Sequence, residues 1–212
     1  MLLSQTRLQK IIRSTQHCIL GVDEVGRGCI AGPVCAGAVI FNLEIKSNTK
    51  LYQDSKKISE SNRELISEEI KKNHLWALGW ASAEEVDQLN IRQASLLAMK
   101  RAVDTLLFQD KIQIIKQDKI ILIDGRDNLP NFVLCPQQSV IKGDQKVKQI
   151  SAASIVAKVA RDQFMKAEAK KYPGYGFEKH KGYGTEEHRN AIAKKGITKI
   201  HRKTFGGVKE WL

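Results

Sequence analysis

The stretch GVDEVGRGCIAGPVCAGAVIF, residues 21–41, contains two apolar runs separated by a polar interruption. The first run ends in the acidic pair Asp23 and Glu24, and a Gly-Arg-Gly tripeptide follows at residues 26–28. The second run covers residues 34–41 and is apolar throughout. Short apolar runs bounded by glycine are typical of strands buried in a sheet. The stretch therefore predicts two core strands, with two carboxylates and an arginine at the place where the first strand ends.

The rest of the chain alternates between strand-like and helix-like patterns. Apolar runs predict further strands over residues 75–81, 119–123 and, more faintly, 131–134, and the first strand is expected to begin at residue 17. Strands come first and in succession, and later strands alternate with helices. This order predicts an α/β fold with a mixed sheet flanked by helices, in which an antiparallel meander is followed by parallel strands.

Start and stop signals predict where the helices lie. The expected helices are one opened by a capping box at Ser61 and Glu64 and running to about residue 72, one opened by a capping box at Ser82 and Glu85, one over residues 91–108, a long one from residue 150 that ends before Pro173-Gly174, and one capped by Thr185 that stops at Gly196. The sequence thus places helices in the connections that parallel strands require.

The length of 212 residues and the 42% apolar content are enough for one sizeable core. We expect a main domain over residues 1–171 and a small basic helical segment over 172–212. The N-terminal dozen residues resemble an amphipathic helix rather than a signal peptide, and no apolar run is long enough to span a membrane. The four cysteines form no CxxC pair, which favours reduced core residues in a cytoplasmic protein.

Positive charge is concentrated near the C-terminus. Residues 142–212 hold 17 Lys and Arg against 7 Asp and Glu, a net charge of +10, whereas residues 1–141 hold 18 against 16, a net charge of +2. Phosphate neutralisation by such side chains gives affinity for nucleic acid without sequence preference. A nucleic-acid partner is one interpretation, and a basic protein without such a partner is the other. Nothing in the sequence indicates an obligate dimer, so we expect a monomer.

Carboxylates stand at the ends of two predicted core strands. Asp23 and Glu24 end one, Asp124 ends another, and Asp144 lies in the turn before the long helix. Buried carboxylates are costly unless they are paired or bind metal, and such oxygen ligands suit Mg²⁺ or Mn²⁺. Each acid alone is more typical of a structural residue, but together they favour a metal site. Since adjacent strand residues point to opposite faces, we expect the strand to end or bulge at residues 23–24.

Three other polar sites each allow two interpretations. The tripeptide 26–28 is either a plain tight turn or backbone that approaches a ribose 2′-hydroxyl. Ser55, Lys56 and Lys57 belong either to a solvated loop or to a phosphate contact. Residues 172–185, YPGYGFEKHKGYGT, are either a glycine-rich loop with packed tyrosines or a surface where rings stack on sugars while cations hold phosphates.

Taken together, these segments resemble one family. GVDEVGRGCIAGPV, DSKKIS, ILIDG, VIKGD, ISAASIVAKVARD and HKGYGT occur in the order seen in bacterial ribonuclease HII, and the resemblance covers about residues 18–207. It implies a ribonuclease H-like fold and an endoribonuclease that cleaves the RNA strand of RNA–DNA hybrids. It further implies incision 5′ to single ribonucleotides in duplex DNA, by two-metal-ion hydrolysis that leaves 5′-phosphate and 3′-hydroxyl ends.

The resemblance also implies roles for individual residues. Those with an implied role are the metal-binding catalytic acids Asp23, Glu24, Asp124 and Asp144, the ribose-sensing turn Gly26, Arg27 and Gly28, and Tyr183, which stacks on the following deoxyribose. Ser55, Lys56 and Lys57 stay candidate substrate contacts from their residue types alone. Mn²⁺ or Mg²⁺ would be the cofactor. Asp162 is the rival to Asp144 as the fourth acid. A metal-dependent DNA nuclease and a binding module without catalysis remain the competing hypotheses.

Overall fold

The computed structural model describes residues 17–42, 48–52, 58–109 and 118–212, together with the single residues 6, 10, 45 and 55. In this part of the chain, five strands form one sheet in the order β3-β2-β1-β4-β5. Their bounds are β1 His17–Val25, β2 Val34–Ile40, β3 Leu75–Ala81, β4 Asp118–Asp124 and β5 Gln137–Val140. Strands β1, β2 and β3 pair antiparallel, whereas β4 pairs parallel with β1 and with β5. The predicted mixed sheet is therefore confirmed.

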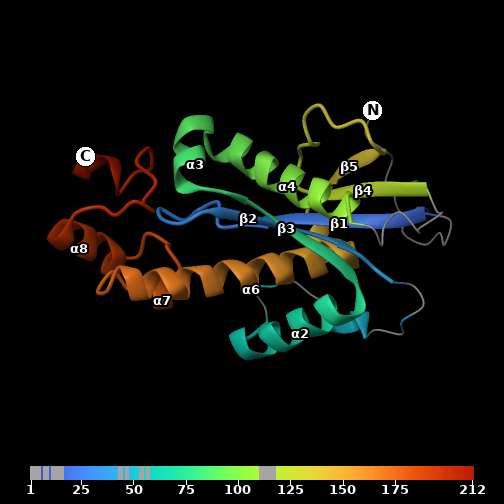
Figure 1. The fold of residues 1–212 in the computed structure, drawn as a ribbon, viewed down its shortest axis with the longest axis horizontal. Coiled ribbons are helices and arrows are strands. Elements are labelled where there is room, and N and C mark those ends of the chain that lie inside the picture. The colour runs from blue at the N-terminus through green and yellow to red at the C-terminus, as the bar shows by residue number, and fades with distance from the viewer. Residues whose placement is uncertain are drawn as a thin grey trace.

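Helices cover both faces of the sheet (Figure 1). The helices are α2 Glu60–Asn73, α3 Ala83–Leu89, α4 Ile91–Leu107, α6 Lys148–Lys171, α7 Phe177–His180 and α8 Glu186–Lys195, with short 3₁₀ turns η1 Thr49–Leu51, η3 Gly143–Gln145 and η4 Lys209–Trp211. Helices α3 and α4 lie on one side, and α6 and α2 lie on the other. The apolar core is consequently split into two layers by the sheet.

Glycines allow these helices to approach the sheet closely. A Cβ atom on Gly37 of β2 would lie 2.3 Å from the Ala153 carbonyl oxygen of α6, and one on Gly79 of β3 would lie 2.1 Å from the Ala98 carbonyl oxygen of α4. Any larger residue would overlap helix backbone, which cannot move as a flexible side chain can. Small residues of α6 thus let its N-terminal half pack closely on β2 and on β1, the strand that carries the acidic pair.

Two element predictions are wrong. Residues 131–134 form no strand, because Asn131 has a left-handed φ of 53° that an extended strand cannot accommodate. The fifth strand is instead β5, whose sequence QQSV is too polar to be recognised as a core strand. The helix expected to open at Ser61 begins earlier, at Glu60, with Ser59 at the N-cap. The capping box at Ser82 is confirmed.

The C-terminal residues pack as a unit against one end of the sheet (Figure 1). Their core contains Phe177, Ile192 and Val208, which pack with Ile30 and with Met165 of α6. The cap of α8 at Thr185 and its end at Gly196 agree with the sequence prediction. Within the described residues, no helix is both long and apolar enough to cross a membrane.

Candidate active site

The acids of β1 and β4 lie on neighbouring strands. The parallel register ends with Val22 opposite Ile123, so Asp23 and Asp124 follow side by side at the same level of the sheet. Neighbouring strands are about 4.8 Å apart, which is close enough for both carboxylates to face one ligand. The structure therefore brings together two acids that are a hundred residues apart in the sequence.

The expected bulge at residues 23–24 is absent. Strand β1 continues to Val25, and its register with β2 is unbroken, with Glu24 opposite Ala36. The two acids accordingly point to opposite faces, as strand geometry requires. Asp23 faces α6, and Glu24 faces the side of the sheet covered by α4 and bonds Arg27 there. Strand β1 extends beyond the last residue of β4, so Asp23 and Glu24 both lie beside the end of β4.

Burial and repulsion disfavour the charge on Asp23. Its side chain is 6% exposed, and burial, followed by the negative charges of Glu24 and Asp124, raises its pKa well above the ordinary value. Two donors oppose this shift in the pKa: the side chain of Ser154 and the Glu24 backbone N–H, which lies 2.7 Å from Asp23 Oδ1. A nearby cation would relieve both the repulsion and the cost of burial.

Burial also disfavours the charge on Glu24, but a neighbouring arginine offsets part of this effect. Burial raises the pKa of its carboxyl, while Arg27, whose Nη1 lies 3.1 Å from Glu24 Oε1, opposes the rise. The negative charge of Asp124 also raises the pKa of Glu24. The three acids therefore share one electrostatic environment, although they come from both faces of the sheet.

The fourth predicted acid, Asp144, lies in η3 beside the end of β4. The backbone N–H of its neighbour Gly143 donates to Asp124 Oδ1 over 2.6 Å. This bond brings the η3 backbone next to the strand end. In the described part of the chain, no three His, Cys, Asp or Glu side chains stand arranged to hold a metal ion. The chemistry of the acids fits a hard divalent cation, but their side chains do not form a closed ligand set.

Asp162, the rival fourth acid, is already neutralised by cations. Its carboxylate lies 2.7 Å from Lys158 Nζ and 3.5 Å from Arg63 Nη1, and it is almost fully buried. Arg63 also donates to the carbonyl oxygens of Ser55 and Ile58. Asp162 thus holds Arg63 against the backbone of Ser55 and Ile58, which is a structural role.

The Gly-Arg-Gly turn lies against the loop that carries Tyr183. Cys29 forms an isolated β-bridge with Tyr183, and the backbone N–H of Ile30 donates to the Gly182 carbonyl over 2.9 Å. A Cβ atom on Gly28 would meet only the Tyr183 ring, at 4.0 Å. The protein's own packing therefore does not require a glycine at residue 28.

The interpretation of residues 172–185 as a loop with packed rings holds for part of the segment. Tyr175 and Phe177 are buried and stack on each other with ring centroids 5.4 Å apart, which is the structural account. His180 bonds its own loop, at 2.7 Å from the Tyr175 carbonyl oxygen. Tyr183 differs, because 44% of its surface is exposed beside the turn. Only this ring among them is well placed to meet a ligand.

Ser55 is linked to the acids through a second serine. Ser55 is 3% exposed, and its Oγ lies 3.1 Å from Ser154 Oγ, whose side chain bonds Asp23. In this arrangement Ser55 positions the loop and does not face solvent. Lys56 and Lys57 lie outside the described residues. Ser154 is a site residue that the sequence did not suggest, because a serine in a helix carries no motif.

Arg161 and Arg202 were missed for the same reason. Both are fully buried and bond the backbone around the Gly-Arg-Gly turn. Arg161 lies within the segment ISAASIVAKVARD, but nothing in the sequence around either arginine indicates that its guanidinium bonds this turn. Only the fold shows that these two arginines point inward.

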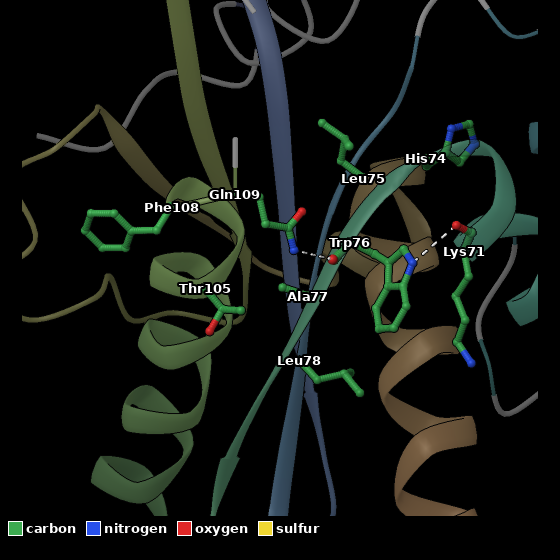
Figure 2. A pocket seen from close by; sticks show the side chains of 9 residues that line it. All are labelled: Lys71, His74, Leu75, Trp76, Ala77, Leu78, Thr105, Phe108 and Gln109. Atoms are coloured by element: carbon green, nitrogen blue, oxygen red, sulfur yellow. Dashed lines mark hydrogen bonds between the residues drawn. The ribbon is translucent and has the colours of Figure 1, made fainter. Parts of the chain in front are cut away.

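A separate hollow lies on the outer edge of β3 (Figure 2). Figure 2 shows Trp76 between the Lys71 backbone and Gln109, whose side-chain amide donates to the Trp76 carbonyl oxygen over 3.1 Å. Strand β3 is separated from β1 by β2, so this hollow is distant from the acids in the sheet order. None of the predicted site residues lines it.

Solved structures of the same architecture define the class of fold. The chain is similar to ribonuclease H2 from Pyrococcus horikoshii OT3, with a TM-score of 0.72, 22% identity and coverage of 91% of this chain and 95% of that one. It is also similar to Bst-RNase HIII in complex with Mn²⁺, with a TM-score of 0.75, 18% identity and coverage of 92% and 69%. The fold is therefore that of the ribonucleases H.

Sequence comparison narrows the class to a family. The family model described as Ribonuclease HII matches residues 20–208. Ribonuclease HII from Pelagibacter ubique is 47% identical over 194 residues, covering 92% of this chain and 98% of its own, and that from Vibrio vulnificus strain YJ016 is 48% identical over 197 residues, covering 92% and 89%. The chain belongs to the ribonuclease HII family and is a nuclease.

Proposed function

We propose that this chain is an endoribonuclease that cleaves the RNA strand of RNA–DNA hybrids and incises 5′ to a single ribonucleotide in duplex DNA. The observation that carries the proposal is the juxtaposition of three elements at one end of the sheet. These elements are the repelling carboxylates, the turn with a bare Gly28, and the exposed Tyr183 ring. A glycine that packing does not require is expected where a ligand approaches the backbone closely.

We assign the metal-binding role to Asp23, Glu24, Asp124 and Asp144. Support comes from the mutual repulsion of the first three, which a divalent cation would remove. Two Mg²⁺ or Mn²⁺ ions bound there would supply an activated water and stabilise the leaving 3′ oxygen, leaving 5′-phosphate and 3′-hydroxyl ends. Gly143 and the Glu24 N–H each hold one aspartate oxygen in place, so these carboxylates are oriented before any ligand arrives.

We assign recognition of the sugar to the turn and to Tyr183. Backbone groups of Gly26, Arg27 and Gly28 would bond the 2′-hydroxyl, which only a ribonucleotide offers. The Tyr183 ring would stack on the sugar that follows. Because this turn leads directly from Glu24, a ribose held there would bring its own phosphate towards the acids.

We assign contact with phosphates further along the duplex to the DSKK loop and to the basic segment 172–212. Lys56 and Lys57 would reach phosphates, with Ser55 holding the loop in register through Ser154. The segment 172–212 would add positive charge beside the turn, since it carries nine Lys and Arg against four Asp and Glu.

The experiment is incubation with a DNA duplex that contains one ribonucleotide, with and without Mn²⁺ or Mg²⁺, and mapping of the cut. We expect cleavage only with the metal, at the phosphate 5′ to the ribonucleotide, and cleavage of a long RNA–DNA hybrid in parallel. An all-DNA duplex of the same sequence is the control and should stay intact. Cutting of the all-DNA duplex at a similar rate would instead indicate a DNA nuclease.

A further inference from the structure

Two guanidinium groups lie buried beneath the Gly-Arg-Gly turn. Arg161 of α6 is 1% exposed, and Arg202, which follows α8, is 0% exposed. Burial lowers the pKa of Arg202 to about 10, so its side chain stays charged at neutral pH. Neither arginine forms an ion pair with a carboxylate of the described residues. Both instead donate to backbone carbonyl oxygens.

Arg202 bonds three carbonyls of the segment that contains the turn. Its Nη2 lies 2.7 Å from the Gly26 oxygen, its Nη1 lies 2.9 Å from the Arg27 oxygen, and its Nε lies 3.0 Å from the Gly32 oxygen. The guanidinium also lies over the Phe205 ring, at 5.1 Å from its centroid. The planar guanidinium donates from three separate nitrogen atoms, one to each carbonyl, whereas the donors of an ammonium group all lie on a single nitrogen.

Arg161 joins the same segment to the loop that carries Tyr183. Its Nε and Nη2 donate to the carbonyls of Pro33 and Ala31 over 2.9 and 3.1 Å, and its Nη1 donates to the Lys181 carbonyl over 2.9 Å. A Cβ atom on Gly26 would lie 2.2 Å from Arg161 Nε, and Gly26 also has a φ of 92°. Gly26 is therefore required by the arginine beneath it, whereas Gly28 is not.

These bonds fix which backbone groups of the turn face inward and which face outward. The carbonyls of Gly26 and Arg27 point inward to a buried positive charge, and the backbone N–H groups of Arg27 and Gly28 have no acceptor among the described residues. Burying an unpaired guanidinium is costly, and several bonds from a charged donor to carbonyls offset that cost. The turn thus offers donors outward, over a positive charge that also favours a nearby phosphate.

We propose that Arg202 is a positioning residue for recognition of the ribose, acting from the C-terminal segment through the carbonyls of Gly26 and Arg27. This inference rests on the proposed function, in which the turn meets the 2′-hydroxyl. Arg202 itself touches no substrate. Its loss therefore acts more strongly on a substrate with one 2′-hydroxyl at the site than on a hybrid, where neighbouring ribonucleotides supply further contacts.

The test compares the wild-type chain with Arg202→Lys on two substrates: a duplex with one ribonucleotide and a long RNA–DNA hybrid. Lysine keeps the charge, but its donors lie on one nitrogen and cannot reproduce three bonds that now come from three separate guanidinium nitrogens. We expect cleavage at the lone ribonucleotide to fall at least tenfold more than cleavage of the hybrid, with KM for the lone ribonucleotide raised. Arg101→Lys on α4, whose guanidinium pairs with Glu85 at the surface, is the matched control and should leave the ratio of the two rates unchanged.

Phe205→Leu is the milder second variant, should Arg202→Lys not fold as judged by circular dichroism. It removes the ring against the guanidinium but keeps an apolar side chain where Phe205 packs against the core, so we expect a smaller change of the rate ratio in the same direction. Equal losses on both substrates, or no loss, in the folded variant would overturn the inference, since a purely structural residue moves both rates together. A wild-type chain that cuts neither substrate would refute the proposed function instead.

Discussion

Asp124 lies where its negative charge raises the pKa of two other carboxyls, those of Asp23 and Glu24. Asp124→Asn keeps the size of the side chain and the oxygen that accepts the Gly143 N–H bond, and removes only the charge. We expect metal-dependent cleavage to fall about a thousandfold, because several kcal/mol of charge stabilisation are lost and each 1.4 kcal/mol is a factor of ten. Without metal, the free energy of unfolding should be unchanged or higher, since repulsion of Asp23 is relieved.

Thermal unfolding with and without Mn²⁺ gives a second measurement that does not depend on cleavage. A ligand that binds only the folded state raises the melting temperature, so the wild-type chain should be stabilised and Asp124→Asn should not. Asp104→Asn, on the surface of α4 beside Lys100, is the matched control. Undiminished cleavage or an undiminished Mn²⁺ shift in the Asp124 variant contradicts the assigned role.

Tyr183 is the exposed ring beside the turn, and its main chain holds the loop to Cys29 through a β-bridge, to which its side chain adds a hydrogen bond with the Cys29 thiol. Tyr183→Ala should therefore leave the fold intact while removing the stacking surface. We expect cleavage at a lone ribonucleotide to fall roughly tenfold to a hundredfold, since stacking of one ring is worth about 1–3 kcal/mol. Tyr183→Phe keeps the ring and should retain most of the rate. If the alanine variant cuts as fast as the wild-type chain, the ring has no part in recognition.

The C-terminal elements contain a buried pair of histidines, His188 of α8 and His201. His188 Nε2 lies 3.0 Å from His201 Nε2, and the Thr198 N–H donates to His201 Nδ1 over 2.8 Å. The proton of His201 is therefore on Nε2 and points to His188, which in turn donates from Nδ1 to the Tyr183 carbonyl at 2.8 Å. Burial lowers the pKa of both histidines to about 4.

This pair predicts loss of stability on acidification. Between an unfolded pKa of about 6.5 and a folded pKa of about 4, the unfolded chain binds more protons, so stability is present above this window and is lost as pH falls through it. Each histidine contributes roughly 1.4 kcal/mol per pH unit there. Denaturant unfolding from pH 7 to pH 4 measures the slope.

The variant His188→Gln separates this effect from the titration of carboxylates in the same pH range. We expect a shallower dependence of the free energy of unfolding on pH. The variant removes one titrating histidine, and it also removes the imidazole that contacts His201. A slope equal to that of the wild-type chain counts against the pair as its cause.

At the scale of the elements, runs of apolar residues correctly predicted the strands whose side chains are mostly apolar. The predicted and observed bounds agree for β1 and for β3, both of which pack against helices. β3 and β5 both lie at edges of the sheet, but β3 is apolar at every position other than its glycine, whereas β5 is Gln-Gln-Ser-Val and gave no signal. The expected bulge failed for another reason: the acids were assumed to share a face, whereas they approach the strand end from both.

The uneven charge belongs to the whole molecule. With net charge +12 concentrated near the C-terminus, binding to a duplex should release condensed counterions. We expect the logarithm of the binding constant to fall linearly with the logarithm of salt concentration, by about 0.9 for each phosphate neutralised. Binding of the Asp124→Asn variant to a hybrid, measured by fluorescence anisotropy at several salt concentrations, gives this slope without cleavage.

The same salt-dependence measurement tests which positive side chains contact the phosphates. In the background of Asp124→Asn, changing Lys194 and Lys199 of the C-terminal segment to glutamine should reduce the slope, because these exposed side chains lie in the segment that we assign to phosphate contact. Lys100→Gln on α4 is the control and should not reduce it. A slope that stays the same in the C-terminal variant shows that these lysines do not meet phosphate.

The sequence alone determined the order of the elements, the family and the identity of the candidate residues, because these depend on local patterns and on short motifs. Periodicity reports which side chains are buried, and a motif such as DEVGRG or HKGYGT is legible without its surroundings. The adjacency of Asp23 and Asp124 was also foreseeable, since parallel strands end at the same edge of a sheet.

Only the tertiary structure decided which groups act on one another. It turned Ser55 inward to Ser154, neutralised Asp162 with Arg63 and Lys158, and buried Arg202 under a turn 175 residues away. The physical reason is that burial, desolvation and hydrogen bonding depend on neighbours in space. An arginine that braces a backbone turn and an arginine in solvent have the same local sequence signal, and the fold alone tells them apart.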